Sequence, residues 1–313
     1  MAALQRLINR AQTGTPIVLD GANGSELERL GARMDQNLWC ACALVDSPEL
    51  VQKVHQRYMD AGADVITTNS FSATREAMSR NGLGRKFEAW NRLSVRLALE
   101  ERDKSSRSEE ICIAGSVSSY GRFDELDSEA QIDHFRAQAS VLVDEGVDLV
   151  VLESLGSSVR TVKSMISATR DLRVPVWVSI SCTLDRETSV VMFGIEESSM
   201  DEKSSQAYAP FSEVIRDIMS VGGSAILMMH SLLSVTTEAV EILRASYDGL
   251  VGAYPNAGYY KEPNWVFEDH VSPDEYVAQA QRWIEAGATI VGGCCGIGVE
   301  HIRRLADSLK NEL

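Results

Sequence analysis

The stretch VDEGVDLVVLES (residues 143–154) decides the fold, because one glycine joins a helix-like segment to a β-branched apolar run. Gly146 stands where helices commonly end, and the residues after it are continuously apolar rather than alternating. The stretches MDAGADVITTN (59–69) and IEAGATIVGGC (284–294) repeat this pattern. Continuous hydrophobicity in a strand that follows a helix is typical of a parallel sheet covered by helices.

Five further apolar runs bring the number of expected strands to eight: IVLD (17–20), ICIAGS (111–116), VWVSIS (176–181), AILMMH (225–230) and GLVGAYPN (249–256). Amphipathic segments lie between most of them. Eight strands alternating with helices predict an α/β fold, a (β/α)8 TIM barrel, formed by residues 1–313 as a single domain. The main competitor is a doubly wound open sheet. It usually has fewer strands at this length, and no GxGxxG turn follows the first strand.

Three longer insertions, residues 22–50, 182–212 and 257–275, each follow an expected strand. Because the carboxyl ends of all strands in a parallel barrel lie at one end, we expect these insertions to rise over that same end.

Composition excludes several classes of function. The net charge of −15 and the absence of a basic run argue against a nucleic-acid partner. No run of eighteen apolar residues occurs, so no membrane span is expected. The start, MAALQRLINRAQTGTP, indicates a short helix rather than a signal peptide, which favours a cytoplasmic location. Six cysteines are too few and too irregularly spaced for a secreted disulfide framework, so we expect them to be reduced.

Barrel active sites lie at the carboxyl ends of the strands, and every expected strand ends in polar or thiol groups. In chain order these are Asp20, Asn69, Ser116, Glu153, Ser181 with Cys182, His230, Asn256, and Cys294 with Cys295. Two thiols and one imidazole form a three-ligand set for Zn²⁺ with the fourth position open, as in catalytic sites. The glycines around Cys294 and Cys295 permit the sharp bend that adjacent ligands need.

Each of these residues also has a structural interpretation. The cysteine pair could be small packing residues, and His230 a core histidine. Asp20 could cap the start of a helix, and the Glu153 side chain could form a hydrogen bond at the rim of the barrel. Cys40 and Cys42, in LWCACAL, fit packing better than chemistry, and Trp39 fits an aromatic wall or the core equally well. A two-carboxylate glycosidase and Schiff-base chemistry are disfavoured, because the strand ends offer no matched carboxylate pair and no lysine.

Seven collinear segments resemble the motifs of the zinc-dependent homocysteine S-methyltransferases. They are VLDGANGSELERLG, NLW, AGADVITTNSF, IAGSV, VLES, AYPNAG and GGCCGIGVEHI, and together they extend over about residues 15 to 308. The family includes betaine-homocysteine and S-methylmethionine-dependent enzymes. The resemblance implies a (β/α)8 barrel in which zinc binds the thiolate of homocysteine, giving methionine.

The resemblance also implies roles for individual residues. It implies that Cys294 and Cys295 bind zinc. Asp20, Gly21 and Glu153 would hold the amino and carboxylate groups of homocysteine. Substrate contacts are also expected from the residues that match further motifs, Trp39 near the methyl donor, Asn69 and Ser116.

One position departs from the family pattern. The third zinc cysteine of the family, in a motif like GxNC, aligns with LMMHS, which puts Met229 at the asparagine and His230 at the cysteine. We therefore predict a Cys₂His zinc site. An imidazole in place of a thiolate makes this site one unit more positive, so it would acidify a bound thiol more strongly but leave the thiolate a weaker nucleophile.

The sequence leaves the methyl donor open, although a small sulfonium such as S-methylmethionine is favoured because no cobalamin or folate domain accompanies the barrel. It also leaves open a related thiol or selenol as acceptor and a homo-oligomer. Three rival functions are a zinc hydrolase or lyase that activates water, a non-catalytic amino-acid or metal sensor, and a phosphate cradle at the last glycines.

Overall fold

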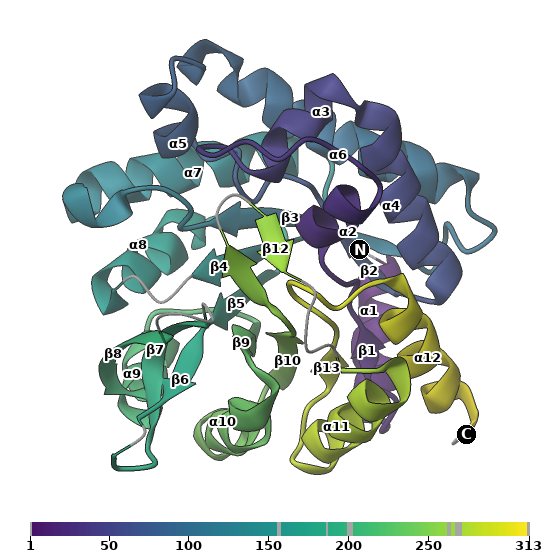
Figure 1. The fold of residues 1–313 in the computed structure, drawn as a ribbon, viewed down its shortest axis with the longest axis vertical. Helices are drawn as coiled ribbons and strands as arrows, with labels where there is room; N and C mark the ends of the chain where they lie inside the picture. Colours follow the sequence, from purple (N-terminus) through teal and green to yellow (C-terminus); the bar gives the residue numbers. More distant parts are fainter. Residues whose placement is uncertain are drawn as a thin grey trace.

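The protein is described by a computed structural model that covers residues 2–154, 158–185, 187–198, 203–261, 264–266 and 271–311. Parts of the predicted insertions at 182–212 and 257–275 lie outside the described residues. Figure 1 shows strands at the centre with helices around them.

Eight parallel strands form one sheet in the order β1-β13-β10-β9-β5-β4-β3-β2. A parallel bridge between Leu19 and Val65 joins the two end strands, so the sheet closes on itself. The expected (β/α)8 barrel is therefore confirmed. The barrel strands are β1 (Ile17–Val18), β2 (Val65–Thr67), β3 (Cys112–Ser118), β4 (Leu149–Ser154), β5 (Val176–Ile180), β9 (Ala225–Leu232), β10 (Leu250–Asn256) and β13 (Ile290–Val291).

Helices surround this barrel and separate its strands along the chain. Those of one turn or more are α1 (Ala2–Gln12), α2 (Asn23–Arg29), α3 (Ala43–Asp46), α4 (Pro48–Ala61), α5 (Arg75–Arg80), α6 (Phe87–Lys104), α7 (Ser128–Glu145), α8 (Val159–Thr169), α9 (Phe211–Met219), α10 (Leu233–Ser246), α11 (Pro273–Glu285) and α12 (Val299–Asn311). Short 3₁₀ turns are η1 (Cys40–Cys42), η2 (Gly84–Lys86) and η3 (Phe123–Glu125). Gly62 and Gly146 end α4 and α7 in the left-handed conformation, as the repeated pattern predicts. None of the helices in the described part of the chain is long and apolar enough to cross a membrane.

Two insertions contain strands of their own. Residues after β5 form an antiparallel sheet of β6 (Cys182–Leu184), β7 (Val191–Ser198) and β8 (Lys203–Pro210). Residues after β10 form a hairpin of β11 (Tyr259–Lys261) and β12 (Asn264–Val266). These strands are not among the eight that the sequence predicts. The β6–β8 sheet lies at the lower left of Figure 1, and β7 contacts β11.

Two hydrophobic clusters follow from the alternation of side chains along the strands. Val150 and Ile226 pack outward against the helices, whereas Val151 and Leu227 point into the barrel. The inner cluster also contains Leu4 and Leu7 of α1, so α1 closes the end of the barrel at which the strands begin. The other end remains available for a site.

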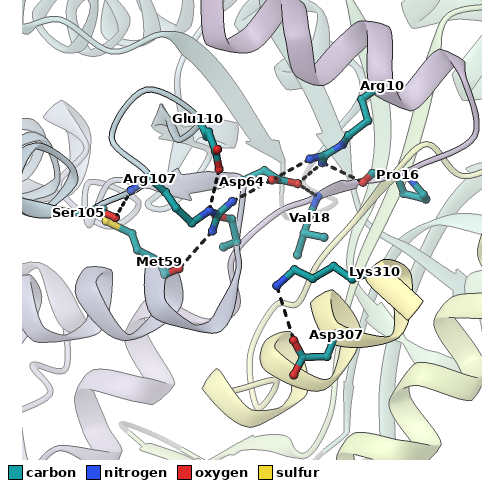
Figure 2. A network of polar contacts seen from close by, with 11 residues as sticks. Arg10, Pro16, Val18, Met59, Asp64, Ser105, Arg107, Glu110, Asp307 and Lys310 are labelled. Carbon is teal, nitrogen blue, oxygen red and sulfur yellow. Dashed lines mark hydrogen bonds and ion pairs between the residues drawn. The ribbon is translucent and has the colours of Figure 1, made fainter. Parts of the chain in front are cut away.

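A polar network ties α1 to the barrel beneath β2 (Figure 2). The buried carboxylate of Asp64 accepts hydrogen bonds from the Val18 N–H at 2.8 Å, from Arg10 Nη1 at 3.3 Å and from Arg107 Nη2 at 3.3 Å. This carboxylate therefore joins α1, β1 and the segment before β3.

Replacing Asp64 with alanine is expected to lower the free energy of unfolding by about 3 kcal/mol, because the Val18 N–H and two guanidinium groups lose their shared acceptor. Asp307→Ala is the control. Asp307 pairs with Lys310 at 3.6 Å in the same view, but 54% of its side chain is exposed, so its loss should cost less than about 1 kcal/mol. Urea denaturation measures the free energy of unfolding of both variants. Equal decreases would contradict the role of Asp64 in joining α1 to the barrel.

Candidate active site

A cavity of about 380 Å³ lies at the carboxyl ends of the barrel strands. It is lined by residues from seven of the eight strand ends, all but that of β5, and from two insertions: Leu19, Asp20, Gly21, Ala22, Asn23, Gly24, Trp39, Cys40, Thr67, Thr68, Asn69, Phe71, Ser116, Tyr120, Glu153, Met229, His230, Tyr254, Asn256, Gly258, Trp265, Gly293, Cys294 and Cys295. The described lining residues include two carboxylates and no lysine or arginine. A ligand with positive charge therefore suits this cavity.

His230, Cys294 and Cys295 come together at one side of the cavity. Their candidate ligand atoms all lie within 4.8 Å of one another. Cys294 Sγ is 3.6 Å from His230 Nδ1 and 3.9 Å from Cys295 Sγ. Tetrahedral zinc, with its usual bond lengths, would place two sulfurs about 3.8 Å apart and a sulfur and a nitrogen about 3.6 Å apart. The spacing of these three atoms therefore fits a zinc ion.

The backbone reaches this arrangement by two local distortions. At the end of β9 the pairing with β10 shifts between Tyr254 and Asn256, and His230 lies in the resulting bulge with a φ of 41°. Bulges of this kind redirect side chains near active sites. In the loop after β13, Gly296 has a φ of 83°, and a Cβ there would lie 1.8 Å from the Ala257 oxygen. A glycine is therefore required directly after the cysteine pair.

The two thiols differ in acidity. The hydrogen bond that they share lowers the pKa of Cys294 and raises that of Cys295. His230 also lowers the pKa of Cys294. Binding a metal to both sulfurs would displace the protons that they carry.

Two carboxylates are buried in the same cavity. Asp20 accepts hydrogen bonds from the Thr67 N–H at 2.8 Å and from Thr67 Oγ1, and burial raises its pKa well above the usual value. Glu153 accepts hydrogen bonds from the Ser116 hydroxyl and from the Tyr254 hydroxyl, the latter at 3.2 Å. Burial raises the pKa of Glu153 to about 7. A cation bound between these groups would restore their charge.

Aromatic rings form another part of the wall. Trp39 meets Phe71 edge-on with ring centroids 6.1 Å apart, and Phe71 lies 5.8 Å from Tyr120. Gly24 makes room for the indole, since a Cβ there would lie 2.3 Å from the Trp39 ring. Electron-rich ring faces attract cations, so this wall also suits a positively charged ligand.

All nine site residues expected from the sequence line this one cavity: Asp20, Gly21, Trp39, Asn69, Ser116, Glu153, His230, Cys294 and Cys295. The side chain of Asn69 is bonded to the early loop, accepting from Cys40 Sγ at 3.2 Å and donating to the Cys40 oxygen at 3.1 Å. Ser181 and Cys182, the expected end of the fifth strand, are not among the lining residues. Cys40, expected to be a packing residue, is buried and also lines the cavity.

Sequence analysis missed several lining residues. Tyr254 stands two positions before Asn256 on β10, and Thr67 ends β2 two positions before Asn69, so this spacing could have identified both. Phe71 lies in the turn after β2, where strand alternation does not apply. Trp265 lies on the hairpin after β10, and no pattern in the sequence connects it with His230.

Comparison with known proteins gives consistent matches. The family model for homocysteine S-methyltransferase matches residues 17–309. Homocysteine S-methyltransferase 4 of Zea mays is 30% identical, over 96% of this chain and 91% of its own length. A selenocysteine methyltransferase of Astragalus bisulcatus is 28% identical, over 96% of this chain and 94% of its own. Among solved structures, the metallated form of the homocysteine methyltransferase MmuM from Escherichia coli superposes with a TM-score of 0.76 and 25% identity, covering 98% of this chain and 99% of that one.

Proposed function

Because this chain belongs to the homocysteine S-methyltransferase family, we propose that a zinc ion on His230, Cys294 and Cys295 prepares the homocysteine thiol for a methyl group from a small sulfonium donor. The chain is a methyltransferase, and methyl transfer to homocysteine is the activity of its family. What we propose is the identity of the metal, the identity of the methyl donor and the roles of the individual site residues.

The observation that carries the proposal is the triangle of two sulfurs and one imidazole nitrogen at the mouth of the barrel. Its spacing suits tetrahedral coordination, and thiolate with imidazole is a donor set that zinc prefers. The similarity to a metallated homocysteine methyltransferase supports a metal here. Zinc bound there would be a Lewis acid that keeps the incoming thiol deprotonated and nucleophilic at neutral pH.

The chain's own residues would orient the acceptor. Asp20 and Glu153 face the cavity and are the two carboxylates of its lining, so we assign them to the ammonium group of homocysteine. A bound ammonium would favour the ionised form of both. Since no basic side chain occurs among the described lining residues, neutral donors such as the second amide N–H of Asn69 and the backbone near Gly21 would hold the substrate carboxylate, while Ser116 would hold Glu153 in place.

The aromatic wall supports a cationic donor. Trp39, Phe71 and Tyr120 present ring surfaces to the same cavity, and a sulfonium methyl group carries the positive charge that such rings attract. In the reaction the methyl carbon leaves the sulfonium sulfur and bonds to the homocysteine sulfur. The electron pair of the broken bond stays on the donor, which becomes a neutral thioether. The thiol proton is released to solvent.

The experiment that tests this function incubates the protein with S-methylmethionine and homocysteine whose carbon backbone is labelled with ¹³C, so that only methionine made from homocysteine carries the label. Labelled methionine should form, and treatment with a chelator should abolish it until Zn²⁺ is restored. Binding of homocysteine with no labelled product from S-methylmethionine, S-adenosylmethionine or betaine would favour a binding protein instead. Product formation that survives removal of all metal would refute the zinc site.

Three further expectations stay predictions. They are the organisation of residues 1–313 as one homocysteine-binding domain, the cytoplasmic location, and the assembly of chains into a homo-oligomer.

A further inference from the structure

Helix α2 (Asn23–Arg29) lies beside both segments that carry the proposed metal ligands. It begins three residues after Asp20, and its residues contact the loop after β13 and the β11–β12 hairpin. The ligands themselves come from β9 and from the loop after β13, which are more than sixty positions apart in the chain. We call the end of β9 that carries His230 the histidine arm, and the loop after β13 that carries Cys294 and Cys295 the cysteine arm. A metal site needs both arms at a fixed separation.

The cysteine arm is held at Gly296, the residue after Cys295. The Gly296 N–H donates to Ser25 Oγ at 3.1 Å, and the Gly296 oxygen accepts from Arg29 Nη2 at 3.1 Å. Both polar groups of this peptide position are therefore bound by side chains of α2. Arg29 is in turn held by Glu26 of the same helix at 3.2 Å.

The histidine arm is held through Trp265 on β12. The indole meets the His230 ring at an interplanar angle of 63°, with centroids 6.1 Å apart, and Trp265 is only 5% exposed. Its backbone N–H donates to Glu28 Oε2 at 3.0 Å. Its indole N–H donates to the Ala257 oxygen at 2.8 Å. The indole that lies against His230 is therefore attached to α2 by a carboxylate.

We propose that α2 positions both arms of the metal site, with Ser25 and Arg29 fixing the cysteine pair and Glu28, acting through Trp265, fixing His230. The proposal rests on the proposed function, since it takes His230, Cys294 and Cys295 as ligands. Ser25, Glu28, Arg29 and Trp265 are not among the three proposed ligands. They are positioning residues, and their loss should weaken metal binding by loosening ligand geometry.

The first test is a double-mutant cycle on metal affinity. Loss of groups that orient metal ligands typically weakens binding 10- to 100-fold, so Trp265→Ala should raise the dissociation constant for Zn²⁺ about 10-fold. In a His230→Ala background the same change should have almost no effect, because the group that Trp265 orients is gone. Ser25→Ala should weaken binding equally with and without His230, because it acts on the cysteine arm.

The second test uses rescue at Glu28. Glu28→Ala removes the acceptor of the Trp265 N–H and should raise the dissociation constant several-fold. Glu28→Gln keeps a carbonyl oxygen at that place and should restore the wild-type value. Trp90→Ala is the control for Trp265, because Trp90 is similarly buried, at 8%, but lies on α6 outside the cavity. Glu88→Gln, at an exposed pair on α6, is the control for Glu28.

Zn²⁺ affinity is measured by competition with a chromophoric chelator, and Co²⁺-loaded protein adds a readout of geometry through its visible absorption. The expected result is a changed Co²⁺ spectrum in Trp265→Ala and Glu28→Ala, and unchanged spectra in Glu28→Gln and both controls. If the wild-type protein binds neither ion, the proposed function falls. If it binds them and the effect of Trp265→Ala is the same with and without His230, or Glu28→Ala matches the wild type, the inference about α2 is overturned. If Trp265→Ala does not fold, the comparison of Glu28→Ala with Glu28→Gln tests whether α2 positions His230.

Discussion

Cys294→Ser is expected to abolish metal retention and to lower kcat/KM by about a thousandfold. The reason is chemical, because the hydroxyl of serine is not ionised at neutral pH and is a poor ligand for a soft metal site. A metal that stabilises the developing charge of the transition state by several kcal/mol raises the rate by about three orders of magnitude. The measurements are the zinc content of the purified protein and the initial rate of methionine formation.

Cys112→Ser is the matched control. Cys112 is as buried as any residue of the barrel, and burial raises the pKa of its thiol to about 12, but it lies at the start of β3 and outside the cavity. Its replacement should reduce stability while the metal and the activity remain. If Cys294→Ser also kept its metal and its rate, Cys294 would be a packing residue, as the simpler interpretation of the sequence allowed.

The sequence was sufficient to place most of this site because of one geometric property of barrels. All parallel strands end at the same rim, so Asp20, Glu153, His230 and Cys294 could be assigned to one cavity before their distances were known. The direction of each side chain still depends on its place in the strand, and Ser181 and Cys182 at the expected end of the fifth strand do not line the cavity. The shared rim explains why residues from distant positions in the chain were correctly grouped.

The parts that the sequence did not predict depend on tertiary contacts. His230 reaches the cysteines through a bulge in β9, and bulges leave no pattern that a strand run can reveal. Trp265 reaches His230 from a hairpin inside an insertion, where no periodicity sets the side-chain direction. The strands of the β6–β8 sheet were missed for a different reason. The run VVMFGI (190–195) is typical of a strand, but it does not belong to the eight alternating strand and helix segments from which the barrel was predicted.

Glu153→Gln is expected to weaken the binding of homocysteine and to stabilise the metal-free protein, because the buried wild-type carboxyl binds substrate but costs stability when it is ionised. Losing the charged partner of the substrate ammonium should cost about 2 kcal/mol, which is about a 30-fold rise in KM for homocysteine. In metal-free protein the same change should raise the free energy of unfolding at pH 8 by roughly 3 kcal/mol. This gain follows because glutamine has no charge to bury, while its amide can still bond Ser116 and Tyr254.

The sign of this effect follows from proton linkage. The pKa of Glu153 is raised by burial from 4.5 to about 7, so between these values the folded wild type keeps a proton that the unfolded chain has released. The ionisation of Glu153 should therefore lower the free energy of unfolding as pH rises through this window. Glu153→Gln should remove this contribution and leave that of Asp20, whose pKa is also raised by burial.

Glu145 gives the opposite case, because Arg96 and Arg92 lower the pKa of its carboxyl. Its contribution is present above its unfolded pKa and is lost as pH falls, so Glu145→Gln should destabilise the protein at neutral pH and have less effect in acid. Denaturation of the three proteins at several pH values compares the slopes. A slope as steep in Glu153→Gln as in the wild type would mean that Glu153 does not titrate in this window, and an unchanged KM would remove Glu153 from the substrate site. At neutral pH the ammonium of bound homocysteine would favour the ionised form of Glu153, so homocysteine should restore part of the stability that this ionisation removes.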